Sequence, residues 1–168
     1  MKKDLLMNFS IDKENKKISV KREFSAPISK VWAAWTESQL LDQWWAPKPW
    51  KAKTKTMNFE EGGYWLYVME GPDGTKHWSR SDYKEITPLK HFSGRDAFCD
   101  EKGQINPDFP ISIWTVDFSD KSNSTVVSIE TKFDDPSHLE KIIEMGFKEG
   151  FTAALENLDE LLNSKWKY

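Results

Sequence analysis

From Pro136 to Leu162 the chain carries apolar residues at intervals of three and four, which is the spacing of a helix with one buried face. Ser137 and Glu140 match a capping box at its start, where Pro136 is also tolerated. The small residues of the apolar face lie one turn apart: Gly146, Gly150 and Ala154. The pattern predicts one long C-terminal helix, with a smooth strip that lets a sheet or a ligand approach its backbone.

The residues before Pro136 form β-branched and aromatic runs separated by turn residues, which is typical of strands. Strands are expected at about 9–11, 18–24, 51–59, 64–70, 76–86, 91–98, 111–118 and 124–133. Two short amphipathic helices are expected between Pro27 and Pro47. Antiparallel strands followed by a helix favour an α+β fold over a parallel α/β fold.

One hairpin allows the faces of the sheet to be predicted. Gly71–Gly74 has Pro at its second position and Gly at its fourth, which suits a type I turn in a four-residue loop. Closing the loop there pairs Tyr67 with Trp78 and Trp65 with Arg80. The face turned to the helix should then hold Trp65, Tyr67, Met69, Trp78 and Arg80, and on later strands Trp114, Val116, Phe118, Val127, Ile129 and Phe133.

Length and composition bound the class of protein. The chain has 168 residues, enough for one domain spanning 1–168 with a core from about residue 18 to residue 162. Its net charge of -3 argues against recruitment of nucleic acid or of an anionic membrane. The lone Cys99 excludes an internal disulfide, and no apolar run approaches the roughly 18 residues of a membrane span. We expect a cytoplasmic protein.

Aromatic content is high, with nine Trp, ten Phe and four Tyr. Trp and Tyr combine a large apolar area with a polar group, so they suit both a packed core and the wall of a ligand cavity. From the sequence alone both interpretations stay open.

Catalytic chemistry has little support in the sequence. His77, His91 and His138 are scattered, Cys99 has no partner, and no nucleophile motif or phosphate-binding loop is present, so we assign no metal ligand, cofactor or catalytic residue. Acid–base catalysis stays open as an alternative, because a cavity that holds Arg80, Asp82 or Asp96 could shift the pKa of one of them and let it transfer protons. The alternative for these residues is a buried Arg–Asp pair that orients the sheet.

Several stretches in order resemble a known family. They are Arg22–Pro27, Val31–Thr36, Trp44–Pro47, Phe59–Trp65, Met69–Gly74 and Glu149–Phe151. They resemble the START-like (SRPBCC) superfamily, and within it the activator of heat-shock protein 90 ATPase homologue-like branch. The resemblance implies a helix-grip fold, in which a curved antiparallel sheet wraps around the long C-terminal helix, with two short helices after the first main strand and a cavity inside. Members carry hydrophobic molecules, shuttle lipids, cyclise polyketides or regulate the chaperone ATPase. In the resemblance, the chaperone activator proper has two domains, and its separate N-terminal domain engages the chaperone. Here only about 17 residues precede the START-like part, which argues against the co-chaperone role.

The sequence therefore predicts a protein that binds a small hydrophobic or aromatic molecule between helix and sheet. The expected lining is Trp35, Trp65, Tyr67, Trp78, Trp114, Phe147 and Phe151, with Arg80 as an anchor for an anionic group. A second hypothesis is a co-chaperone-like module that binds another protein through exposed Trp44, Trp45 and Trp50. A third is an enzyme that acts on small hydrophobic substrates with acid–base residues in the cavity.

Overall fold

The computed structural model describes residues 5–164. The strands are β1 (Met7–Asp12), β2 (Lys17–Phe24), β3 (Lys51–Met57), β4 (Tyr64–Glu70), β5 (Lys76–Thr87), β6 (His91–Cys99), β7 (Ile111–Asp120) and β8 (Thr125–Phe133). The helices are α1 (Ile28–Thr36), α2 (Ser38–Trp44), α3 (Pro136–Glu144) and α4 (Phe147–Leu162). These bounds lie within a few residues of the expected strands.

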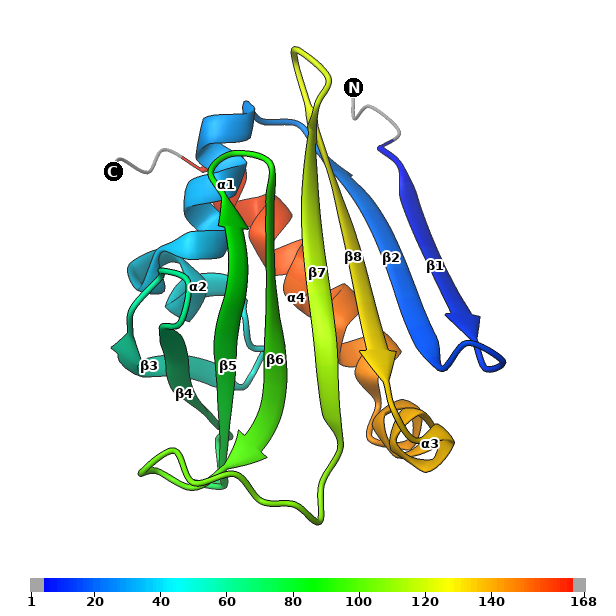
Figure 1. Cartoon of the computed structure of the whole chain (residues 1–168). Helices are drawn as coiled ribbons and strands as arrows, with labels where there is room; N and C mark the ends of the chain where they lie inside the picture. The colour runs from blue at the N-terminus through cyan, green and yellow to red at the C-terminus, as the bar shows by residue number, and fades with distance from the viewer. Residues whose placement is uncertain (1–4, 165–168) are drawn as a thin grey trace.

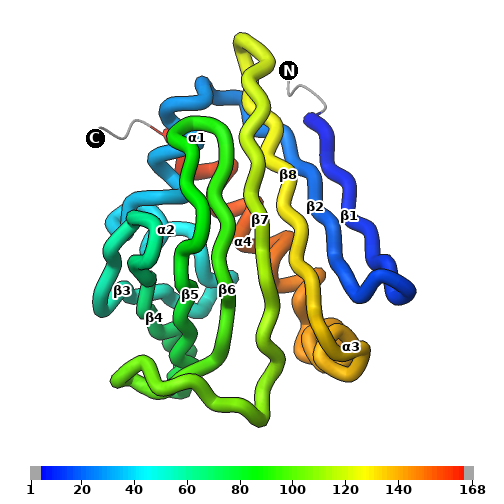
Figure 2. The backbone as a smooth tube through the Cα atoms, viewed as in Figure 1, coloured from blue at the N-terminus to red at the C-terminus, as the bar shows by residue number. Residues whose placement is uncertain are grey.

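The strands form one antiparallel sheet in the order β1-β2-β8-β7-β6-β5-β4-β3. Helices α1 and α2 carry the chain from β2 to β3 on the far edge, and the chain then returns strand by strand until β8 pairs with β2. Figure 1 shows α1, α2 and α4 on one side of the curved sheet, and the backbone trace in Figure 2 shows β1 and β3 at its opposite edges. The predicted α+β helix-grip architecture is confirmed, including the two short helices after β2.

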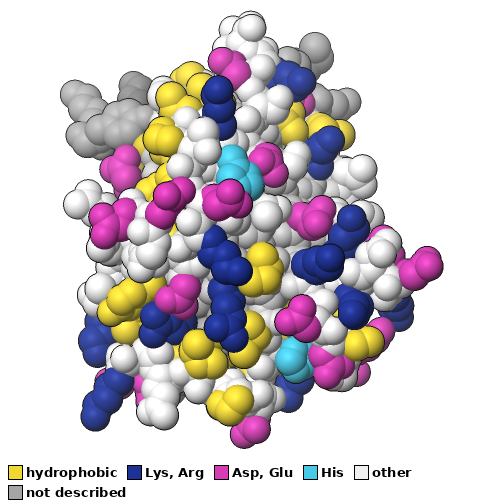
Figure 3. Space-filling model, in the orientation of Figure 1, with side chains coloured by type: hydrophobic (Ala, Val, Ile, Leu, Met, Phe, Trp, Pro, Cys, Tyr) yellow, Lys and Arg dark blue, Asp and Glu magenta, His cyan; other side chains and the backbone are white. Residues whose placement is uncertain are grey.

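Side chains that face the helices form a continuous core. Cross-strand pairs such as Phe92 with Val116 and Val116 with Ile129 place the alternate residues of neighbouring strands on the same face. The predicted inward residues of β7 and β8 are all buried: Trp114, Val116, Phe118, Val127, Ile129 and Phe133. The opposite face carries intermixed acidic and basic side chains with scattered apolar groups between them (Figure 3). This contrast between faces is the usual arrangement of an antiparallel sheet with one side on the core.

The β4–β5 register differs by one residue from the prediction. Glu70 pairs with Lys76, so the loop has five residues, and within it Gly71 N donates to Thr75 O at 2.8 Å. Tyr67 therefore pairs with Ser79 instead of Trp78. Because side chains alternate along a strand, a slip of one residue moves every β5 side chain to the other face. Ser79, Ser81 and Tyr83 share the inner face with Trp65 and Tyr67.

The slip corrects two predicted positions. Trp78 and Arg80 lie on the outer face of the sheet, away from α4. The Arg80 guanidinium is 4.5 Å from the ring centre of Tyr64, donates to Asp82 at 2.7 and 2.9 Å, and donates to Gly103 O at 2.8 Å. Arg80 thus holds the loop after β6 against the sheet and cannot anchor a ligand inside.

The predicted single C-terminal helix is two helices. Gly146 separates α3 from α4 and adopts a left-handed conformation, with φ of 86° and ψ of 30°. In Figure 1 α3 is seen end-on, whereas α4 runs along the sheet. The start of α3 is capped by Asp135, whose side chain accepts a hydrogen bond from Ser137 N at 2.8 Å, so the expected capping box is absent. The apolar spacing continues across the break because Gly146 fits the same pattern, and spacing alone does not detect a reversal of φ.

The glycine break leads to a stability prediction. A Cβ at Gly146 meets no atom closer than 3.8 Å, so Gly146→Ala tests the backbone conformation alone and should destabilise the protein by about 1–2 kcal/mol. Gly150, inside α4, is the matched control, since Gly150→Ala should stabilise it by about 0.5–1 kcal/mol through helix propensity. Urea unfolding of both variants measures the difference. Stabilisation by both alanines would show a continuous helix.

Candidate functional site

Two adjoining pockets lie between the inner face of the sheet and the α3–α4 junction. The larger has a volume of about 260 Å³ and the deeper one about 100 Å³. Both are lined by Tyr67, Asp96, Ile142 and Phe147. The larger pocket is completed by Trp45, Pro47, Met69, Met145, Gly146, Gly150, Phe151 and Ala154, and the deeper one by Ser79, Ala97, Phe98, Pro110, Ser112, Thr131 and Phe133. We refer to the two together as the helix–sheet pocket.

A wider groove of about 620 Å³ lies between α2 and β3. Half of the residues that line it are exposed, among them Lys48, Lys51 and Lys53. In the larger part of the helix–sheet pocket, every lining residue except Met145 is buried or half-buried. Enclosure and apolar lining are the usual properties of a small-molecule site, so the helix–sheet pocket is the candidate.

Small residues on α4 keep the pocket open. Gly150 has only Pro47 Cγ near its position, where an added Cβ would lie 3.8 Å away. Gly146 and Ala154 flank it by one turn on each side, and all three line the pocket. Large side chains at these positions would fill the space, so the strip of small residues predicted from the sequence borders a cavity instead of a packed sheet.

Aromatic rings form the walls. Phe147 and Phe151 stack on the helix side, with ring centres 5.3 Å apart and planes at 22°. On the sheet side Tyr67 stacks on Trp65 at 4.0 Å. Trp45 closes a third side, with its ring centre 6.2 Å from that of Phe151 and 6.3 Å from that of Tyr67.

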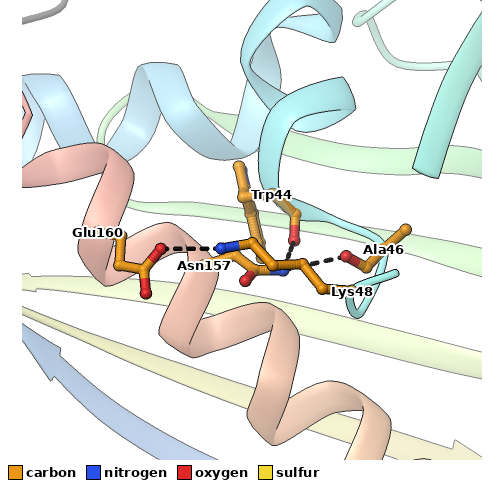
Figure 4. A network of polar contacts seen from close by, with 5 residues as sticks. All are labelled: Trp44, Ala46, Lys48, Asn157 and Glu160. Carbon is orange, nitrogen blue, oxygen red and sulfur yellow. Dashed lines mark hydrogen bonds and ion pairs between the residues drawn. The ribbon is translucent and has the colours of Figure 1, made fainter. Parts of the chain in front are cut away.

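Asn157 on α4 fixes the wall that Trp45 and Pro47 provide. Its Nδ2 donates to Ala46 O at 3.0 Å and to Trp44 O at 3.4 Å, and Lys48 Nζ lies 3.1 Å from Glu160 Oε2 (Figure 4). These contacts tie the segment after α2 to the helix. The amide accounts for backbone carbonyls that would otherwise lack a partner at the end of a short helix.

Asp96 supplies the polar end of the pocket. It lies on β6 opposite Ser81 of β5 and Ser112 of β7, all on the inner face. Burial raises the pKa of the Asp96 carboxyl to about 7, a hydrogen bond with Ser81 opposes the rise, and the charge of Asp82 adds to it. Asp96 is the one acidic or basic side chain among the residues that line the pocket.

A glycine allows this arrangement. Trp114 Nε1 donates to Ser81 Oγ at 2.9 Å, which leaves the Ser81 hydroxyl hydrogen for Asp96. The indole passes over Gly94, where an added Cβ would lie 3.2 Å from Trp114 Nε1 and 2.9 Å from Asp82 O. A larger residue at position 94 would push the indole away from Ser81.

Tyr67 and Trp45 add polar atoms beside the carboxyl. Burial raises the pKa of Tyr67 far above its usual value, and the charge of Asp96 raises it further. Trp45 Nε1 is buried and completes no hydrogen bond within the described residues, although it lies near enough to the Tyr67 hydroxyl to lower that pKa. The pocket therefore offers a carboxyl, a phenol and an indole N–H, together with the hydroxyls of its deeper part, within largely apolar walls.

The eight predicted site residues fall into three groups. Tyr67, Phe147 and Phe151 line the pocket. Trp35, Trp65 and Trp114 are buried in the core behind it, and Trp78 and Arg80 lie on the outer face. The Trp65 indole turns toward β3, where Nε1 donates to Thr54 Oγ1 at 2.9 Å.

Sequence reasoning missed Trp45 and Asp96 as parts of the pocket. The sequence suggests Asp96, Arg80 and Asp82 together as cavity acid–base residues or as a buried Arg–Asp pair. In the structure Asp96 lies on the inner face of the sheet, whereas Arg80 and Asp82 lie on the outer face. The position of Asp96 could have been inferred from Trp114, which the sequence places on the inner face. Gly94 pairs with Trp114, and Asp96 lies two residues further along the strand, on the same face. The direction of the Trp45 side chain could not be predicted from the sequence, because Trp45 lies at the end of α2 and the turn that follows decides where its ring points.

Neither a metal-binding cluster nor a membrane-spanning helix is found among residues 5–164. No three His, Cys, Asp or Glu side chains of that range lie close enough together to hold a metal ion. Within the same range no helix has the length and apolar character needed to cross a membrane.

A curved antiparallel sheet over a C-terminal helix, with a pocket between them, defines the START-like class of helix-grip proteins. The model of the family described as activator of Hsp90 ATPase homolog 1-like protein matches residues 25–163. The chain belongs to this family.

Solved structures agree with this assignment. The chain is similar to a protein from Arthrobacter aurescens, with 33% identity, a TM-score of 0.87, and 92% of this chain and 90% of that chain covered. A protein from Staphylococcus epidermidis is 28% identical, with a TM-score of 0.81 over 95% and 96% of the two chains. A protein from Mycobacterium smegmatis shares the fold, with 24% identity and a TM-score of 0.87 over 98% and 100%. Among proteins with curated descriptions, none matches the chain.

Asp96 should make stability depend on pH. A pKa near 7 in the folded state, against 3.8 when exposed, means that the native protein keeps a proton that the unfolded chain releases between these values. The free energy of unfolding should therefore fall as pH rises from about 4 to about 7, by on the order of 1–3 kcal/mol from this group. Asp96→Asn should remove that component and be the more stable protein at pH 8.

The measurement is urea unfolding of both proteins at several pH values between 4 and 8. Other titrating groups contribute equally to both curves, so their difference isolates Asp96. Asp108→Asn removes the same charge from an exposed loop and should follow the wild type. Parallel curves for wild type and Asp96→Asn would contradict the assignment.

Proposed function

We propose that this protein binds a small apolar or aromatic molecule in the helix–sheet pocket. The observation that carries the proposal is an aromatic-walled space of about 260 Å³ bordered by Gly146, Gly150 and Ala154, where larger residues would have filled it. This volume lies just below the range of about 300–1,000 Å³ usual for small-molecule sites. It favours a compact ligand of one or two rings over a sterol or a long-chain lipid.

The protein-interaction hypothesis has less support. It depends on exposed tryptophans, yet Trp44 is fully buried with Nε1 donating to Ala34 O at 2.8 Å, and Trp45 packs in the pocket wall. Trp50 is half-buried and stacks on His77 at 5.4 Å. None of the three projects as an anchor for another protein.

The enzyme hypothesis also has less support than binding. Acid–base catalysis needs groups that exchange protons near the working pH. Asp96 meets this condition, but the pKa of Tyr67 lies far too high for a second exchanging group. We therefore propose a binding protein that acts as one START-like domain. For its location we propose the cytoplasm, since a lone cysteine fits a reducing compartment.

A thermal-shift screen tests the proposal. At about 100 times its dissociation constant, a ligand that binds only the folded state adds about 2.7 kcal/mol of stability. For a domain of this size the melting midpoint should then rise by roughly 5–11 °C. The screen should cover compact aromatic acids, alcohols and amines, together with flavonoids, fatty acids and sterols, and we expect a clear stabiliser among the compact aromatic compounds.

Three variants locate the site. Gly150→Leu should fill the pocket and abolish the ligand-induced shift, whereas Gly150→Ala should retain it. Trp45→Phe should keep binding but reduce the quenching of tryptophan fluorescence, because Trp45 is the indole in the pocket wall. If no compound stabilises the wild type, or if Gly150→Leu responds to ligand as fully as the wild type does, the proposal fails.

A further inference from the structure

The carboxyl of Asp96 has no cation to neutralise it. Two described arginines close to Asp96 in the sheet point away from it: Arg80 forms an ion pair with Asp82 on the outer face, and Arg95, which lies opposite Asp82 in the register, is exposed. No ion pair to Asp96 occurs within residues 5–164. A half-buried carboxylate without an oppositely charged partner is costly, so a ligand that supplies a positive charge gains more here than at a solvated surface.

The groups that surround Asp96 on the inner face of the sheet are neutral. Tyr67 on β4, Ser79, Ser81 and Tyr83 on β5, and Ser112 on β7 present hydroxyls. The side chains of α3, α4 and the turn between them that line the pocket are apolar, and they include Ile142, Met145 and Phe147. Asp82 is the one charged group whose field reaches Asp96, and its negative charge also favours a cation in the pocket.

The walls suit a cation as well. Tyr67, Phe147 and Trp45 line the same space, and aromatic faces attract ammonium groups within about 6 Å of the ring centre. The remaining volume accommodates a flat apolar body between the rings. An anionic ligand would meet the carboxyl with like charge, and Arg80 lies on the wrong face to compensate.

We infer that the helix–sheet pocket selects small aromatic amines, with the protonated nitrogen paired to Asp96 and the ring held between Phe147 and Tyr67. This inference rests on the proposed function and names its ligand class. A neutral ligand can occupy the same space but leaves the carboxyl unpaired, and an anion is rejected.

Three matched probes test the inference by calorimetry at pH 8: naphthylethylamine, naphthylethanol and naphthylacetate. They share one ring system and differ in the charge of the terminal group. The wild type should bind the amine tightest and the acetate weakest. Asp96→Asn should weaken amine binding by about 10- to 150-fold, the range for a charged hydrogen bond. Its affinity for the alcohol should stay within about threefold of wild type.

The controls separate Asp96 from net charge and from misfolding. Asp108→Asn carries the same charge change in an exposed loop and should bind all three probes as the wild type does. Retained alcohol binding by Asp96→Asn shows that its pocket is intact. Amine affinity should also rise by about 10- to 100-fold from pH 5 to pH 8 as Asp96 ionises, whereas a carbonyl ligand bound to the protonated carboxyl would show the opposite trend.

An amine that binds no tighter than the alcohol, or does not bind, overturns the inference. The inference is also overturned if Asp96→Asn still binds the amine more tightly than the alcohol by the same factor as the wild type. An amine affinity that does not rise between pH 5 and pH 8 overturns it as well. These outcomes leave the proposed function standing as long as some compound in the thermal-shift screen binds the pocket. A screen in which nothing binds removes both.

Discussion

The alternation of side chains along antiparallel strands is the constraint on which the pocket depends. Tyr67, Ser81 and Asp96 meet inside because their strands pair in one particular register. The same register sends Arg80 and Trp78 outward. Since one residue of slip exchanges the two faces of β5, the loop between β4 and β5 keeps the Arg80 guanidinium out of the interior. The charge preference of the site therefore depends partly on a turn that contributes no atom to it.

The aromatic residues serve packing more than ligand contact. Trp35, Trp44 and Trp65 are almost completely buried, and their rings meet edge to face or stack with neighbours in the core. Such pairs add stability beyond the area that they bury. Trp45 differs because it lies at the end of this cluster and faces the pocket. The core and the pocket thus form one continuous aromatic layer, in which the empty volume begins where α4 carries glycine and alanine.

The C-terminal helices combine rigidity with space. Gly146 lets the chain change direction, so that α3 closes one end of the pocket while α4 lies along the sheet. Asn157 holds the segment with Trp45 and Pro47 against α4. A preformed pocket of this kind spares a ligand part of the ordering cost of binding. Within it, Asp96 is half-buried, which makes its charge sensitive to what occupies the space.

Sequence alone determined the α+β architecture, the strands, the small-residue strip of α4 and the inward residues of β7 and β8, because these depend on periodicity over many residues. It also named Tyr67, Phe147 and Phe151, which line the helix–sheet pocket. It did not determine the helix break at Gly146, where a single φ changes while the spacing of apolar residues continues. It misplaced Trp78 and Arg80 because a four-residue and a five-residue loop fit the same turn residues. Only the tertiary structure decided that Asp96 faces the pocket, since a side chain's face depends on pairing with strands distant in the sequence.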